Sequence, residues 1–110
     1  MSVPMNLAAQ HCRPLEGHNA MNAAEVQRHL DDAPGWALVS GSIEKTYRFE
    51  DYHRTMAFVN AVAWIAHRED HHPDIAFGYN RCTLRFNTHS VGGISLNDFI
   101  CAAKVDALLA

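Results

Sequence analysis

The clearest alternation of apolar and polar positions lies in the segment 79–88. Cys82, Leu84 and Phe86 alternate there with polar residues. A period of two predicts a strand with one buried and one wetter face, as in an antiparallel sheet. A shorter strand is expected just before it, from Ile75 to Gly78.

Two further runs, 36–39 and 43–49, are rich in β-branched and aromatic residues and flank Ser40-Gly41-Ser42. This arrangement predicts a β-hairpin. Ile43, Tyr47 and Phe49 share one face of the second run, but Lys45 interrupts that face. We therefore expect this strand to be partly open to solvent or to a partner.

Helical periodicity and capping residues predict three helices. Asn22 and Glu25 form a capping-box pattern before a short helix that Pro34-Gly35 ends, and Ser95 and Asp98 form a similar pattern before the last helix. Between them, a helix is expected from Asp51 to about Glu69. Its apolar sector covers about half of the circumference, wider than the usual stripe of about 100°. The sector has two stripes: Tyr52, Met56, Val59, Ala63 and Ala66, and beside them Phe58, Val62 and Ile65.

The last helix also has two apolar faces. Its second face, with Cys101, Val105 and Leu108, suggests contact with another subunit. Taken together, the order helix, two strands, long helix, two strands, helix predicts a two-layer α+β domain at 22–110. Its four-stranded antiparallel sheet would carry the helices on one face. Residues 1–21 contain Pro4, Pro14 and Gly17 without a sustained period, so we interpret them as an N-terminal arm.

Composition narrows the class of protein. Of the 110 residues, 48% are hydrophobic and 19% charged, as in ordinary globular domains. A net charge of -3 with scattered basic residues argues against direct nucleic-acid binding. No apolar run approaches the roughly 18 residues that would cross a membrane. The three cysteines have no CxxC spacing, so we expect reduced thiols and a cytoplasmic protein.

The stretch from Glu69 to Asp74 is the main candidate for chemistry. His71 and His72 lie between carboxylates, where a helix must end before Pro73, and His89 follows about eighteen residues later. Imidazoles at element ends suit general acid/base catalysis near neutral pH. The same pattern also suits a plain polar helix terminus, where cations lie near the negative end of the helix dipole.

Two other kinds of chemistry are less well supported. A metal site could combine Asp70, His71, His72 and His89, but the side chains of adjacent histidines usually diverge, unlike an i, i+4 pair on a helix. A serine nucleophile in a GxSxG-like turn is absent from the sequence, and no cysteine lies near the histidines. We expect neither a metal nor a cofactor.

With these residues in view, the sequence resembles pterin-4a-carbinolamine dehydratases of the bacterial type. The resemblance covers about residues 45–106 and is carried by short segments: Lys45-Thr46-Tyr47-Arg48-Phe49, Phe58-Val59-Asn60, Asp70-His71-His72-Pro73-Asp74, Tyr79-Asn80, Thr88-His89, Gly92-Gly93 and Asp98. Residues 1–35 match loosely. Two departures affect the pocket: His67 stands where many relatives have glutamate, and Ile75 where they often have an aromatic residue.

The resemblance implies a function and a set of site residues. Members of this family eliminate water from 4a-hydroxytetrahydropterin to give quinonoid dihydropterin, which recycles the cofactor of aromatic amino acid hydroxylases. By this analogy His71 and His89 are the acid/base pair and His72 positions the pterin, so these three form the catalytic set. His67 and Asp98 are candidates for tuning it. The residues expected to contact substrate are Asp70, His71, His72, Pro73, Asn87, Thr88, His89 and Ser90.

The resemblance also leaves an alternative function open. Animal relatives serve as dimerisation cofactors for a homeodomain transcription factor, so a protein-binding module for a transcription regulator, without catalysis, is conceivable. Retention of His71, His72 and His89 favours the enzyme, because a binding module has no use for them. In either case we expect a homodimer or a homotetramer.

Overall fold

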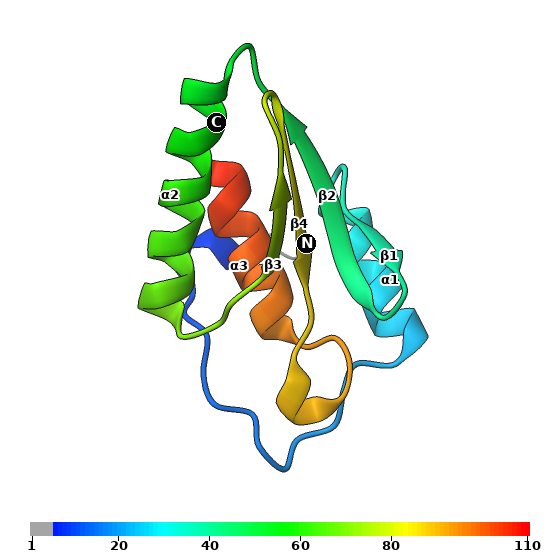
Figure 1. Ribbon diagram of the computed structural model, residues 1–110. Helices are drawn as coiled ribbons and strands as arrows, with labels where there is room; N and C mark the ends of the chain where they lie inside the picture. Colours follow the sequence, from blue (N-terminus) through cyan, green and yellow to red (C-terminus); the bar gives the residue numbers. More distant parts are fainter. Residues whose placement is uncertain (1–5) are drawn as a thin grey trace.

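The structure, a computed structural model, describes residues 6–110, and it confirms an α+β fold with helices on one face of a four-stranded sheet (Figure 1). No helix in this range is long and apolar enough to cross a membrane. The elements in chain order are η1 (Leu7–Ala9), α1 (Ala23–Asp31), β1 (Ala37–Val39), β2 (Ser42–Arg48), α2 (Tyr52–Glu69), β3 (Asp74–Phe77), β4 (Arg81–Phe86), η2 (His89–Val91) and α3 (Leu96–Ala107).

The sheet has the strand order β1-β2-β4-β3, and every neighbouring pair is antiparallel. In the predicted hairpin, Val39 pairs with Ser42, so the turn is the two residues Ser40 and Gly41. Both have positive φ, 49° and 80°. This is the left-handed backbone that two-residue hairpins with a type I′ turn require, and it explains the glycine.

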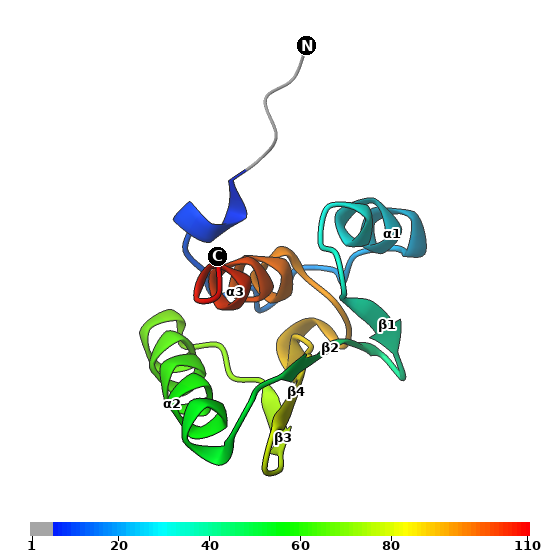
Figure 2. The ribbon, with the colours of Figure 1, turned by 90° about the horizontal axis from the view of Figure 1, so that it is seen from above.

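The helices lie together on one side of the sheet, with α3 between α1 and α2 (Figure 2). The alternation predicted for β4 is confirmed, since Cys82, Leu84 and Phe86 are all buried beneath the helices. The capping predictions are also confirmed. Asn22 and Ser95 each form a complete capping box, and the side chain of Asp51 accepts the Arg54 N–H at the start of α2.

The two stripes predicted on α2 are not equally buried. Phe58 and Val62 point into the core, as does Ala66 of the other stripe, whereas Tyr52 and Ala63 of that stripe remain exposed. The sheet and α3 cover only one side of this helix. The side of α2 that carries Tyr52 and Ala63 is therefore only partly covered in the single chain.

Two expectations about solvent-facing surfaces are wrong. Cys101 and Val105, on the second apolar face of α3, are buried within the chain, because η1 and α2 both pack against this helix. Lys45 does not open β2 to solvent either. Its ammonium group lies over the ring of Tyr47 and donates to the carboxylate of Asp106, 2.8 Å away.

The described part of the predicted arm, residues 6–21, is attached to the domain at several points. Lys104 donates to the carbonyl of Ala8 at 2.8 Å, and the N–H of Met21 donates to the carbonyl of Ile94 at the same distance. Between these points, the backbone of Cys12 and Arg13 is bound by side chains of α2 and α3. Residues 1–5 of the predicted arm lie outside the described residues.

Candidate functional site

The end of α2 determines where His71 lies. Asp70 adopts the left-handed conformation, with φ 50° and ψ 44°, and the helix cannot continue through it. The N–H of Asp70 donates to the carbonyl of His67 at 3.4 Å, and that of His71 donates to the carbonyl of Ala66 at 3.2 Å. These two bonds form a Schellman motif, which turns the chain sharply. His71 therefore leaves the helix and points toward the start of α3.

Asp98 binds the imidazole of His71. The distance from His71 Nε2 to Asp98 Oδ1 is 2.6 Å, and the Asp98 side chain is fully buried. The other carboxylate oxygen accepts the Thr88 hydroxyl at 2.8 Å and the Ser95 N–H at 2.9 Å. The His71 ring also stacks on Phe86, with an angle of 8° between the ring planes. Hydrogen bonding and stacking together fix the orientation of the ring.

This arrangement defines what His71 can do chemically. A carboxylate accepts hydrogen bonds, so the Nε2 nitrogen that faces Asp98 carries a proton. The second ring nitrogen, Nδ1, is then left to accept or donate a proton. The geometry is that of a general acid/base with a positioning partner.

His71 lies in a cavity of about 350 Å³. Four of the residues predicted to contact substrate are among its walls: Asp70, His71, Thr88 and Ser90. The remaining wall residues come from the arm, from the end of α2 and from the start of α3; they are Cys12, Arg13, Pro14, Leu15, Glu16, Arg68, Glu69 and Asn97.

The other predicted residues lie outside this cavity. His89 and Asn87 line a separate hollow of about 210 Å³ together with Gly41, Gly92 and Gly93. His72 and Pro73 line neither cavity, and the His72 side chain is exposed. The segment 88–90 borders both cavities, because Thr88 and Ser90 line the first and His89 the second.

His67 does not share a surface with His71. Helical spacing would place the two residues on one side of α2. The helix ends between them, however, and the ring of His67 lies against Trp64 on the exposed surface, with ring centroids 5.6 Å apart. Trp64 itself is 60% exposed.

The contribution of the arm to the site was not predicted from any sequence pattern. Glu69 accepts the N–H of Cys12 at 2.7 Å and the ring of His11 at 2.9 Å. Asn97 accepts the N–H of Arg13 at 3.2 Å and donates to its carbonyl at 2.8 Å. These residues are 57–84 positions apart, and most of the contacts involve backbone groups, so they leave no pattern in a single sequence.

The arm also changes the protonation of the groups that it contacts. Burial alone would raise the pKa of Glu69, but the Cys12 N–H, His11 and Lys104 together lower it below its ordinary value. Cys12 and Cys101 are free thiols whose sulfur atoms are 3.5 Å apart. This contact, together with burial, raises the pKa of the Cys101 thiol. Both effects depend on the docked position of the arm.

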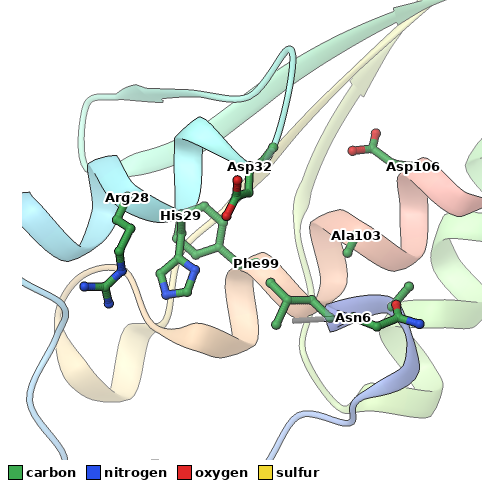
Figure 3. Close-up of a pocket in the computed structure, with 10 residues that line it drawn as sticks. Asn6, Arg28, His29, Asp32, Phe99, Ala103 and Asp106 are labelled. Atoms are coloured by element: carbon green, nitrogen blue, oxygen red, sulfur yellow. The ribbon is translucent and has the colours of Figure 1, made fainter. Parts of the chain in front are cut away.

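A larger cavity of about 410 Å³ lies on another side of α3, between η1 and α1 (Figure 3). The ring of His29 lies against Phe99 there, and burial together with Arg28 lowers the pKa of His29. None of the residues predicted to act on substrate lines this cavity. Among residues 6–110, no group of three or more His, Cys, Asp or Glu side chains is arranged to hold a metal ion.

Comparison with known proteins agrees with the resemblance. The sequence model of the family described as pterin 4 alpha carbinolamine dehydratase matches residues 19–108. A protein of Chromobacterium violaceum named "Putative pterin-4-alpha-carbinolamine dehydratase" is 52% identical over 104 residues, which cover 94% of this chain and 96% of that protein. A protein of the same name from Hydrogenovibrio crunogenus is 49% identical, with 99% of both chains covered.

Two solved structures are also similar. A transcriptional coactivator/pterin dehydratase from Brucella melitensis has a TM-score of 0.80 and 29% identity, and the match covers 84% of this chain and all of that one. A pterin dehydratase-like protein identified as a RuBisCO assembly factor in the alpha-carboxysome has a TM-score of 0.56 and 26% identity, over 66% of this chain and 84% of that one. The extent of these matches shows that the chain belongs to the pterin 4 alpha carbinolamine dehydratase family.

Proposed function

We propose that this protein is a hydro-lyase that eliminates water from 4a-hydroxytetrahydropterin and forms quinonoid dihydropterin. This reaction would return the cofactor of aromatic amino acid hydroxylases to its recycling route. The observation that carries the proposal is the His71–Asp98 pair: an oriented imidazole, held at 2.6 Å by a buried carboxylate, in the wall of a cavity.

The chemistry needs two proton transfers. A base removes the proton from N5 of the pterin, and an acid protonates the hydroxyl on C4a, which leaves as water. No electrons are gained or lost, so His71 and His89 suffice as the acid/base pair, without a metal or cofactor. His72 positions the pterin. Of the residues proposed to contact it, Asp70, Thr88 and Ser90 line the His71 cavity, Asn87 lines the neighbouring hollow, and His72 and Pro73 line neither.

The direct test is a stopped-flow assay with chemically generated 4a-hydroxytetrahydropterin and purified protein. Dehydration no faster than the spontaneous rate would reject the enzyme. In an active enzyme, replacing His71 or His89 with alanine is expected to lower the rate about 10²–10⁴-fold, the usual contribution of general acid/base catalysis.

His67 provides the matched control for these variants. It lies against Trp64 on the exposed face of α2, so His67→Ala is expected to cost much less than His89→Ala. His67→Glu, which restores the residue of many relatives, is likewise expected to be tolerated. If His67→Ala were inactive and His71→Ala active, the proposal would have assigned the proton transfer to the wrong residue.

A second candidate function is protein binding without catalysis, as a dimerisation cofactor for a transcription regulator. It is favoured by the similar structure from Brucella melitensis, which is described as both a coactivator and a pterin dehydratase. A double variant, His71→Ala with His89→Ala, distinguishes the two functions. A protein-binding role would survive replacement of both His71 and His89 by alanine, whereas dehydration would not.

We also propose a homodimer or homotetramer in the cytoplasm. The side of α2 that carries Tyr52 and Ala63 supports assembly, because both side chains are exposed in the single chain. The three free cysteines in the described chain suit a reducing compartment.

A further inference from the structure

The arm lies against the same cavity as His71. Five consecutive arm residues, 12–16, line it opposite residues from the end of α2 and from the segment 88–90. Pro14 and Leu15 contribute apolar surface at the centre of this run, and Leu15 is partly buried. The family model begins only at residue 19, so this wall lies outside the matched region.

The cavity wall formed by residues 12–16 is held by Asn97 and Glu69, which lie close in sequence to Asp98 and His71. Asn97 binds the backbone of Arg13 through two hydrogen bonds, and it directly precedes Asp98. Glu69 binds the backbone N–H of Cys12, and it lies two residues before His71. The wall and the imidazole are therefore fixed to the same two helix ends. Their relative position does not depend on a long or flexible connection.

Beyond Arg13 the chain makes a tight turn. The N–H of His18 donates to the carbonyl of Leu15 at 2.9 Å, which closes a turn. Gly17 occupies the third position of this turn with φ 85°, the conformation that a type II turn requires there. The turn fixes Leu15 from one side and the Arg13–Asn97 bonds fix it from the other.

We propose that Pro14 and Leu15 form a substrate-contacting wall that determines how tightly this protein holds a pterin. The inference rests on the proposed function, because it assigns the ligand of the His71 cavity. A pterin has a flat ring with apolar faces and a polar edge, and an apolar wall suits the faces. Neither side chain can donate or accept a proton. The wall thus contributes binding energy that is equal in the ground state and the transition state, which changes KM and leaves kcat unaltered.

The test compares the same substitution at two arm leucines. Leu15→Ala removes apolar surface from the His71 cavity, whereas Leu7→Ala removes it from the other cavity, beside Phe99. The probe is biopterin, a stable oxidised pterin, titrated by fluorescence; steady-state KM and kcat are measured in parallel. We expect Leu15→Ala to raise Kd and KM about three- to tenfold, from the lost apolar contact. The volume-conserving variant Leu15→Met is expected to restore most of the affinity.

The outcomes separate this inference from the proposed function. Equal Kd values for wild type, Leu15→Ala and Leu7→Ala would overturn the wall and leave dehydration untouched. A fall in kcat without a change in KM would also overturn it. If wild-type protein binds biopterin but does not accelerate dehydration, the proposed catalysis is rejected. The wall is then judged from the Kd values alone. If wild-type protein does not bind biopterin at all, the wall proposal fails, and dehydration is still judged by the stopped-flow assay.

Discussion

At the scale of single residues, Asp98 has the largest number of roles. Its carboxylate closes the capping box of α3, accepts the Thr88 hydroxyl and binds His71, and it is fully buried. Removing it outright would leave the buried Ser95 N–H without this acceptor and the Thr88 hydroxyl with only the Ser95 hydroxyl as partner, which costs stability. A substitution that keeps the shape of the side chain is therefore the better probe.

Asp98→Asn is expected to lower kcat about 10²–10⁴-fold, as does loss of a catalytic acid or base. The amide oxygen can replace the carboxylate toward Ser95 N–H, but the amide nitrogen then donates to His71 Nε2. The ring must adopt its other tautomer, in which Nδ1 carries the proton and cannot accept another. Stopped-flow dehydration measures the effect. Asp106→Asn, on the same helix but outside the cavity, is the control, and equal kcat values for both variants would contradict the role of Asp98.

At the scale of elements, the arm is held to α2 by a charge. The carboxylate of Glu69 is 5% exposed, and its pKa is lowered chiefly through the Cys12 N–H and His11, against the effect of burial. A lowered pKa means that docking is stabilised by the ionised form. This stabilisation is complete above the ordinary value of 4.5 and is lost as the pH falls below it.

We therefore expect the arm to detach at acidic pH before the domain unfolds. Hydrogen exchange of the Cys12 amide, which donates to Glu69, is expected to show protection at pH 7 and to lose it progressively below about pH 4.5, relative to amides of β4. In Glu69→Gln the arm is expected to be less protected at pH 7 and insensitive to pH over this range. Equal protection in the two proteins at pH 7 would rule out the charge as the anchor.

The opposite end of α3 is fastened to the sheet by Asp106. Its carboxylate accepts Trp36 Nε1 at 3.0 Å, Lys45 Nζ at 2.8 Å and the Tyr47 hydroxyl at 2.5 Å. Burial, with this hydrogen bond, raises the pKa of Tyr47 above its ordinary value, so the hydroxyl remains a donor. Trp36 and Tyr47 are only 5% and 6% exposed.

Asp106→Ala is expected to lower the free energy of unfolding by about 1–2 kcal/mol, because two nearly buried donors lose their acceptor. Urea denaturation provides the measurement. Leu108→Ala removes a larger side chain two residues later, but Leu108 is 42% exposed. That control is expected to change stability by less than about 0.5 kcal/mol. Similar losses in both variants would mean that Asp106 acts only through general packing.

At the scale of the whole molecule, the open side of α2 is the expected contact between subunits. Ala63→Glu places a charge on this side, next to Trp64, which is 60% exposed. Light scattering at micromolar concentration is expected to give a dimer or tetramer for the wild-type protein and a lower mass for this variant. Ala24→Glu, on the exposed side of α1, is expected to keep the wild-type mass. A monomeric wild-type protein would contradict the assembly.

The difference between what the sequence predicted and what it did not follows from distance along the chain. Capping boxes at Asn22 and Ser95 and the turn at Ser40-Gly41 depend on neighbouring residues, and all three were predicted. The His71–Asp98 contact joins residues 27 positions apart. The capping pattern named Asp98 only as part of a helix start, and its place at the site was named through family resemblance. The arm contacts, the end of α2 at Asp70 and the burial of Lys45 against Asp106 depend on tertiary packing, which leaves no period in the sequence.

The bound arm has a consequence for how a ligand would enter the cavity. Ordering a flexible segment costs about 1–2 kcal/mol of backbone entropy per residue. Segment 12–16 is already held by Asn97, Glu69 and the turn at Leu15 when the chain is folded, so this cost falls on folding and not on association. Binding to such a preformed surface is expected to proceed in one kinetic phase, with an observed rate that rises linearly with pterin concentration and does not reach the plateau of a slow closure step.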